Sequence, residues 1–268
     1  MLTPDLWDNE VHKDPPTVDY QSVMDDKSSG LAQLTMKLVS DPRPDVLGSR
    51  IQPVITQRKR GLCFVQGTPH DNPEHTQKLL ERIAFIRQTH YGGFYDFKPD
   101  LAMADTAYTN QALALHTDNT YFTDPAGLQA FHMLSHEPVG PEGRVTGGES
   151  VLLDGFNAAR ILFQENRAAY RVLAYKGIPC HSSGNKGIKI TTDVKYPVFE
   201  EHPVSGHVLR IRWNNDDRGV VSFGKVTPEQ WYEAASKWHE IINRPELQYW
   251  FQLTPGRVLS KHLRGEGM

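Results

Sequence analysis

Residues 180–225 alternate in short runs separated by Gly, Asn and Asp, and this pattern limits the fold more than any other feature of the chain. The segments HSSGNKGIKITTDVKYPVFE and HVLRIRWNNDDRGVVSF are typical of strands joined by hairpin turns. We expect further strands over 61–67, 101–108, 127–137 and 251–260. Many short strands with a few helices indicate a mostly β protein with flanking helices, either a β-sandwich or a jelly roll.

One flanking helix is expected between residues 68 and 90. Asp71 or Asn72 can cap it, and Pro73 suits its first turn. Its apolar stripe would comprise Leu79, Leu80, Ile83 and Ile86. The stripe predicts a helix of about sixteen residues.

Two later segments also predict helices. TGGESVLLDGF (146–156) is typical of a turn, a strand and the start of a helix, which should continue through NAARILFQENRAAYRVLA. In TPEQWYEAASKWHEIIN, Thr227 and Gln230 form a capping box, and Pro228 takes the first helical position. The buried face of this last helix is expected to comprise Trp231, Ala235, Trp238 and Ile242.

Composition excludes several classes of protein. The chain has 268 residues, 38% of them hydrophobic, which is enough for one large domain. A net charge of -3 and a single short basic cluster at 57–61 argue against a nucleic-acid surface. No apolar run approaches the ~18 residues of a membrane span, and the first residues do not form a signal peptide. The two cysteines, Cys63 and Cys180, fit a reducing compartment, so we expect a cytoplasmic protein, with the mitochondrial matrix as the alternative.

The stretch LALHTDNTYF (113–122) places a histidine two residues before an aspartate in apolar and aromatic surroundings. On a strand, residues two apart share a face, so His116 and Asp118 would point the same way. Such a pair supplies two ligands of the facial triad of non-haem Fe(II) oxygenases. A buried His–Asp hydrogen bond without a metal explains the same spacing, and the residues alone leave both interpretations open.

Four segments, taken in order, resemble one family: LLERIAFIRQTHYGGFYDF, DTAYTNQALALHTDNTYFTDPAGLQAFH, TGGESVLLDGF and RIRWNNDDR. They are similar to the 2-oxoglutarate-dependent oxygenases of carnitine biosynthesis, trimethyllysine dioxygenase and γ-butyrobetaine dioxygenase, in the TauD/TfdA superfamily. The resemblance runs from Gly61 to Leu259. It implies a double-stranded β-helix, the clavaminate synthase-like jelly roll. It also implies a reaction that uses Fe(II), O2 and 2-oxoglutarate, with ascorbate as reductant.

The resemblance assigns roles to particular positions. His116 and Asp118 match the first two iron ligands, and Thr146 matches a threonine that helps to hold the distal carboxylate of 2-oxoglutarate. The positions that match the substrate pocket are Tyr91, Tyr95, Asp105, Tyr108, Asn214 and Asn215. Structural interpretations stay open for several of these: a turn for Thr146 and the asparagines, and the edge of a core for the tyrosines.

The implied substrates carry a trimethylammonium group, which has no N–H and is held over aromatic faces. Tyr91 and Tyr95 share a face if their stretch is helical. Asp105 stands where the γ-butyrobetaine enzyme has an asparagine facing the carboxylate of its substrate. A carboxylate there would repel γ-butyrobetaine but could pair with the α-ammonium group of trimethyllysine, so Asp105 favours trimethyllysine.

The C-terminal sequence departs from the family pattern. The family continues after its PG-x-V strand to a third iron ligand, a histidine, and then to an arginine that binds 2-oxoglutarate. Here TPGRVL leads into SKHLRGEGM, and His262 lies several residues before the expected ligand. We therefore expect a jelly roll that is incomplete at this end and lacks the third ligand. The expected divisions are an irregular arm at 1–58, the oxygenase domain at 59–260 and a non-family tail at 261–268, without the N-terminal zinc module of animal relatives.

Three functions are compatible with these features. The leading one is hydroxylation of N6,N6,N6-trimethyllysine, and the second is the sister reaction on γ-butyrobetaine. The third is a catalytically inactive relative that only binds a quaternary ammonium ligand. In each case the partners are a small molecule and, for the oxygenases, O2, with no nucleic acid or membrane, and a homodimer is expected as in relatives.

Overall fold

The structure is a computed structural model that describes residues 15, 17–25, 61–96, 111–137, 147–183 and 187–262. These residues contain ten strands, five α-helices and one 3-10 helix, so strands outnumber helices as predicted. The chain forms two compact units whose segments alternate in sequence. Unit 1 comprises 1–96, 128–150 and 249–262, and unit 2 comprises 97–127, 151–248 and 263–268.

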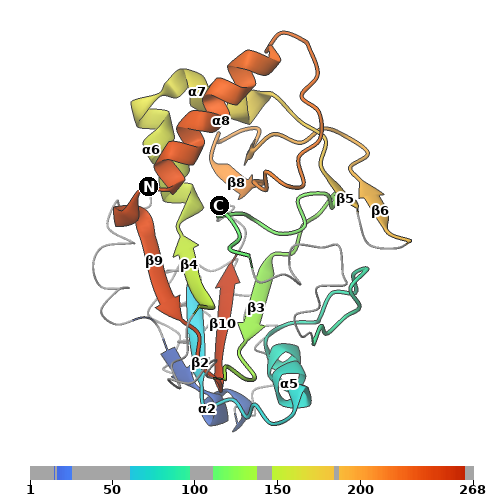
Figure 1. The fold of residues 1–268 in the computed structure, drawn as a ribbon, viewed down its shortest axis with the longest axis vertical. Coiled ribbons are helices and arrows are strands. Elements are labelled where there is room, and N and C mark those ends of the chain that lie inside the picture. The colour runs from blue at the N-terminus through green and yellow to red at the C-terminus, as the bar shows by residue number, and fades with distance from the viewer. Residues whose placement is uncertain are drawn as a thin grey trace. The chain divides into compact units, whose positions relative to one another are not determined.

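Unit 1 is built on a four-stranded sheet in the order β1-β2-β10-β3 (Figure 1). Its strands are β1 (Thr17–Asp19), β2 (Leu62–Gln66), β10 (Arg257–His262) and β3 (Leu128–His132). β1 is parallel to β2, whereas β10 is antiparallel to both of its neighbours. The predicted first strand is confirmed. Of the strand predicted over 251–260, the part after the Pro-Gly turn is β10, which continues to His262, and the strand predicted over 127–137 is shorter than expected.

Two helices, α2 (Tyr20–Asp25) and α5 (Pro73–Ile83), belong to unit 1. Asn72 caps α5 by accepting a hydrogen bond from the Glu74 backbone, as the sequence predicted. The helix ends at Ile83 because Ala84 is extended (φ -160°), so the prediction that the helical stripe includes Ile86 is wrong. The core of this unit comprises Val23, Val65, Leu79 and Val258.

The helices of unit 2 are α6 (Gly155–Glu165), α7 (Arg167–Tyr175) and α8 (Pro228–Ile242). The prediction of one continuous helix after residue 155 is wrong. The chain divides at Asn166, whose side chain accepts a hydrogen bond from the Ala169 backbone and starts α7. An asparagine favours this arrangement because its side chain competes with the helical backbone for hydrogen bonds.

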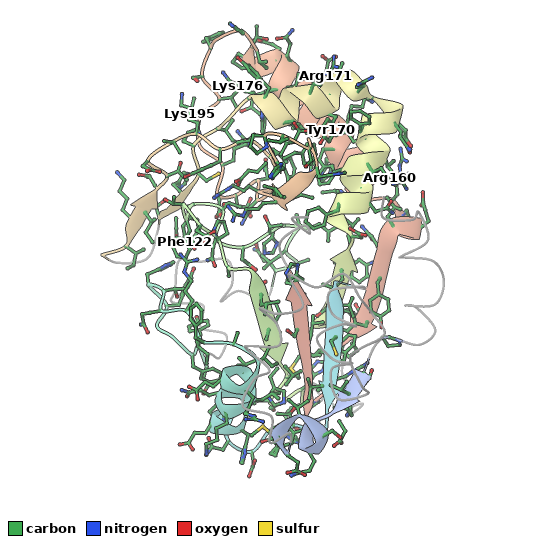
Figure 2. All side chains as sticks on the ribbon, turned by 180° about the vertical axis from the view of Figure 1, so that it is seen from behind. Phe122, Arg160, Tyr170, Arg171, Lys176 and Lys195 are labelled. Atoms are coloured by element: carbon green, nitrogen blue, oxygen red, sulfur yellow. The ribbon has the colours of Figure 1, made fainter. Side chains whose placement is uncertain are left out.

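Helix α8 confirms its prediction in detail. Thr227 and Gln230 form the capping box, with Pro228 in the first turn. Trp231, Ala235, Trp238 and Ile242 are all buried in the main core of unit 2. Aromatic rings pack edge to face around Trp238, with Phe199 at 5.1 Å between centroids. Tyr170, labelled in Figure 2, stacks on Phe199 at 4.9 Å between centroids.

The segment 180–225 forms two short antiparallel pairs, as its punctuation predicted. One pair is β5 (His181–Ser183) with β6 (Lys189–Thr191), and the other is β7 (Phe199–Glu201) with β8 (Val208–Ile211). Glu200 lies opposite Arg210 in the second pair. The 3-10 helix η4 (Pro245–Leu247) follows α8. The strands β4 (Glu149–Leu153) and β9 (Gln248–Gln252) lie where the chain passes between units.

Some predictions fall outside the described residues. The strand expected over 101–108 and residues 263–268 of the tail expected at 261–268 are among them, whereas residues 261 and 262 belong to β10. Only 15 and 17–25 of the N-terminal arm are described. Within the described parts of the chain, none of the helices is both long and apolar enough to cross a lipid bilayer.

Candidate metal centre

His116 and Asp118 come together in unit 2. Nε2 of His116 lies 3.4 Å from Oδ1 of Asp118, and their side chains are 28% and 32% exposed. This separation exceeds the usual ~2.7–3.2 Å of an N–H···O hydrogen bond. Two adjacent ligands of one ion, each bonded at about 2.1 Å, lie about 3 Å apart. The pair therefore has the spacing and access that two ligands of one ion require.

The backbone determines which nitrogen of His116 faces Asp118. Nδ1 lies 2.7 Å from the carbonyl oxygen of Ala114. A carbonyl can only accept, so Nδ1 carries the hydrogen and, in the neutral ring, Nε2 carries the lone pair. Metal-binding histidines usually donate their second ring N–H to a carbonyl or carboxylate in this way. The local structure thus holds His116 in the tautomer that suits a metal ligand.

The predicted strand for this motif is wrong, because residues 113–122 form turns and irregular backbone. Thr117 contacts a distant segment: its N–H donates to the Trp213 carbonyl at 2.7 Å, and its hydroxyl accepts from the Trp213 N–H at 2.9 Å. Because a side-chain oxygen replaces a backbone carbonyl, this contact does not extend into a regular ladder. Asn119 then adopts a left-handed conformation (φ 57°), which begins a turn. The two side chains meet although the backbone is irregular.

An additional carboxylate lies in the electrostatic neighbourhood of this pair. The Thr120 hydroxyl donates to Oδ2 of Asp217 at 2.6 Å. Burial, with a smaller effect from the charge of Asp118, raises the pKa of the Asp217 carboxyl, while the Thr120 hydrogen bond and the nearby His116 and His181 lower it, and the result is a pKa of about 6. A third ionisable group therefore lies near the His-x-Asp pair.

Asn214 and Asn215, the predicted polar contacts to substrate, lie in the same unit. Oδ1 of Asn214 accepts a hydrogen bond from the Asp216 backbone at 3.0 Å, which is the turn role left open for it. Oδ1 of Asn215 accepts from Nε of Arg218 at 3.2 Å, and Arg218 also donates to the Tyr232 hydroxyl at 2.9 Å. Asn215 is exposed, and the Arg218 guanidinium orients its side chain. The side-chain oxygen of Asn214 already accepts a hydrogen bond within the turn.

Tyr91 and Tyr95 lie in unit 1, outside any helix. A bridge between Thr89 and Gly92 turns the chain here, so the helical condition for a shared face is not met. The two rings nevertheless lie 5.3 Å apart at 46°, and His90 contacts Tyr91 at 4.0 Å between centroids. The segment presents grouped aromatic faces, as a trimethylammonium pocket would need.

Three other predicted site residues, Thr146, Asp105 and Tyr108, lie outside the described residues. Of the TGGES motif, the structure describes the two glycines and the residues after them. Gly147 and Gly148 both have positive φ (78° and 77°), a conformation that glycine adopts without strain.

Among the described residues, no group of three or more His, Cys, Asp or Glu side chains is arranged to hold a metal ion. His262 ends β10, where its N–H donates to the Gly61 carbonyl at 2.8 Å. The assignment of His116 and Asp118 as ligands thus stays a prediction that rests on their mutual geometry.

Sequence reasoning did not select Arg212, which is buried, or Asp217. Both lie in the RIRWNNDDR segment, where the resemblance assigns roles only to Asn214 and Asn215. The sequence contains a signal for Arg212. Its arginines alternate with apolar residues on a strand next to the core, and a charge that is buried there requires a partner of opposite charge.

Comparison with known proteins identifies the family. Residues 39–260 match the family described as "Taurine catabolism dioxygenase TauD, TfdA family". Trimethyllysine dioxygenase of Neurospora crassa is 48% identical, over 95% of this chain and 55% of its own length. The human enzyme "Trimethyllysine dioxygenase, mitochondrial" is 34% identical over the same shares. Human γ-butyrobetaine dioxygenase is 28% identical, over 76% of this chain and 51% of its own. The chain spans about half the length of these curated relatives.

Solved structures confirm the predicted jelly roll with flanking helices. A taurine dioxygenase from Burkholderia xenovorans superposes with a TM-score of 0.52, over 85% of this chain and 77% of that chain, at 15% identity. The PvcB protein from Pseudomonas aeruginosa gives 0.51, over 77% and 68%, at 14% identity. Because the family match covers most of the sequence, this chain belongs to the TauD/TfdA family of dioxygenases.

Proposed function

We propose that this chain carries the metal-ligand pair of an Fe(II)- and 2-oxoglutarate-dependent dioxygenase that hydroxylates N6,N6,N6-trimethyllysine at the carbon next to the one bearing the amino group. The observation that carries the metal assignment is the approach of His116 Nε2 to Asp118 Oδ1, with Nδ1 held by the Ala114 carbonyl. The family match supports the reaction class. The 48% identity to a trimethyllysine dioxygenase supports the substrate.

His116 and Asp118 would supply two of the ligands of a ferrous ion. His116 offers a neutral imidazole nitrogen, and Asp118 offers a carboxylate that offsets one of the two metal charges. Held by these two residues, Fe(II) would supply, with O2, the oxidation that couples conversion of 2-oxoglutarate to succinate and CO2 with hydroxylation of a substrate C–H bond. Thr146 is proposed to donate to the distal carboxylate of 2-oxoglutarate, and ascorbate is proposed as the reductant.

Substrate binding is proposed to use both ends of trimethyllysine. Tyr91, Tyr95 and Tyr108 would face the trimethylammonium group, and the grouped rings of the first two support this. Asp105 would pair with the α-ammonium group. Asn215, oriented by Arg218, is the better placed of the two asparagines to contact the amino-acid end, because the Asn214 oxygen already serves the turn.

The compartment and assembly belong to the same proposal. We infer a cytoplasmic location, with the mitochondrial matrix as the alternative that the names of the mammalian relatives support. A homodimer without nucleic-acid or membrane partners is also proposed.

The metal assignment is tested by anaerobic titration of the metal-free chain with Mn(II), followed by electron paramagnetic resonance. His116→Gln and Asp118→Asn are each expected to weaken binding at least about tenfold, since each removes one of the two ligands. His239→Gln, an exposed position on α8, is the matched control and should bind as the original chain does. Equal Mn(II) affinity in all four proteins would refute the assignment and favour an inactive relative.

The substrate assignment is tested by succinate formation with Fe(II), 2-oxoglutarate and ascorbate. Trimethyllysine should stimulate succinate release more than γ-butyrobetaine does. Asp105→Asn should shift this preference toward γ-butyrobetaine, because the repulsion of its carboxylate is removed. An unchanged ranking in Asp105→Asn would refute the role given to this carboxylate.

A further inference from the structure

Arg212 directly follows β8 and is buried, with a side chain only 2% exposed. Its guanidinium makes an unusually complete set of hydrogen bonds. Nε donates to Oε1 of Glu200, one terminal nitrogen donates to the carbonyls of Thr120 (2.9 Å) and Phe122, and the other donates to the Thr123 carbonyl at 2.8 Å. Phe122 is labelled in Figure 2.

A buried guanidinium is costly unless it is paired and hydrogen-bonded. Glu200 supplies the opposite charge, and the ring of Tyr196 lies 3.9 Å from the guanidinium carbon, which adds a cation–π contact. Arg210, two residues earlier, also contacts Glu200 and donates to Asp124 at 2.7 Å. Two arginines on one side of β8 thus share one carboxylate and reach the same loop.

The loop they reach begins two residues after Asp118. Upstream of Asp118, Thr117 is tied to Trp213 through its N–H and hydroxyl. Downstream, two of the three carbonyls that Arg212 binds belong to the turn that Asn119 starts, where the Phe122 N–H donates to the Asn119 carbonyl at 3.0 Å, and the third, that of Thr123, directly follows this turn. Asp118 therefore lies between two attachment points, and residues 212 and 213 supply both.

The chemistry of these contacts requires arginine. Three carbonyls and one carboxylate receive hydrogen bonds from different edges of one planar group, which only a guanidinium presents. A lysine ammonium has three donors at a single point and cannot span the same acceptors. The contacts fix the path of the backbone and do not involve the side chains of residues 120, 122 and 123.

We propose that Arg212 is a positioning residue for the metal-ligand pair: its guanidinium fixes the turn 120–123 and thereby sets the separation of His116 and Asp118. Its hold on the turn runs through three backbone carbonyls, so it acts on the pair through the backbone. Metal binding by the pair rests on the function proposed above. The contacts between Arg212 and the turn do not depend on that function.

Hydrogen–deuterium exchange of the metal-free chain tests the hold directly. In Arg212→Lys, the hydrogen-bonded amides of Thr117 and Phe122 should exchange at least about tenfold faster, while amides of α6 and α8 keep their rates. The matched control is Arg244→Lys, which alters a two-bond ion pair with Glu165 on the surface. It should leave residues 117–122 unchanged.

Glu200→Gln provides a second variant that keeps Arg212 and weakens its anchor. It should speed exchange over 117–122 by a smaller factor, about threefold, in the same residues. If Arg212→Lys does not fold, this variant decides the question. Unchanged exchange over 117–122 in the folded variants, or an increase spread evenly over α6 and α8, overturns the proposal.

Mn(II) affinity provides a second measurement, which should not change if a substitution only increases flexibility in other parts of the chain. Arg212→Lys should weaken Mn(II) binding about tenfold, and Arg244→Lys should not change it. If the original chain binds no Mn(II) while the exchange contrast over 117–122 is present, the proposed metal function fails and the positioning role of Arg212 stands. Unaltered Mn(II) affinity in Arg212→Lys, in a chain that does bind the ion, overturns the role.

Discussion

The stability of unit 1 should depend on keeping His132 neutral, and His132→Asn tests this. Nδ1 of His132 lies 2.6 Å from the Thr76 hydroxyl, and Nε2 is buried without a hydrogen-bond partner among the described residues. Burial, with a smaller effect from the charge of His70, lowers the pKa of His132 from 6.5 to about 4. Protonation would add a charge and a second N–H to this ring, and the described residues offer no acceptor for that second N–H.

The direction of the pH effect follows from which state binds more protons. Between pH 6.5 and 4 the unfolded chain protonates His132 and the folded chain does not, so the free energy of unfolding falls as pH decreases. With these two pKa values, lowering the pH from 7 to 5 removes about 2 kcal/mol, and at pH 4 the loss approaches 3 kcal/mol. Asparagine keeps a polar group near Thr76 but does not titrate.

Urea unfolding at pH 7, 6 and 5 measures this contribution. The relevant quantity is the difference between the original chain and His132→Asn, because contributions that the two proteins share cancel in it. The original chain should lose about 2 kcal/mol more than the variant between pH 7 and pH 5. If the free energy of unfolding depends on pH in the same way in both proteins, His132 has the same pKa in the folded and the unfolded chain, and burial does not lower it.

Two further changes test the packing of α8 by urea unfolding. Thr227→Ala removes the hydroxyl of the capping box and should lower the free energy of unfolding by about 1 kcal/mol. Thr227→Ser keeps a hydroxyl at this position and should lose only a small part of that amount. Trp238→Ala opens a cavity beside Phe199 and should cost about 3–5 kcal/mol, since Trp238 is only 2% exposed. A loss below about 1 kcal/mol in Trp238→Ala would mean that the core closes around the change.

Elements with local start and stop signals were predictable from the sequence. The capping box at Thr227 lies within four residues of the chain, so no distant contact is needed to interpret it. The apolar stripe of α5 misled the prediction of its length, because Ile86 continues the spacing although the backbone leaves the helix at Ala84. At Asn166 the pattern predicted a continuous helix where the structure starts a new one. A capping residue inside an apolar pattern is easily taken for a tolerated helical residue.

At the site, spacing predicted that His116 and Asp118 meet, but it did not predict the irregular backbone on which they meet. That backbone depends on Trp213 and Arg212, which lie far along the chain. Arg212 recognises backbone carbonyls, and any sequence supplies these, so its partners leave no pattern in the loop itself. A contact of this kind becomes visible only when the loop and β8 are placed together.

The position of β10 has a consequence for how the protein is made. β2 and β3 both pair with β10, which is the last of the described strands in sequence and the central partner of the two (Figure 1). During synthesis, β2 and β3 emerge first and present hydrogen-bonding edges that find their partner only when residues 257–262 leave the ribosome. Until then, β1 is the only described strand with which β2 can pair, so a nascent chain is exposed to aggregation until β10 has been made, and chaperones that cover strand edges would act in that interval.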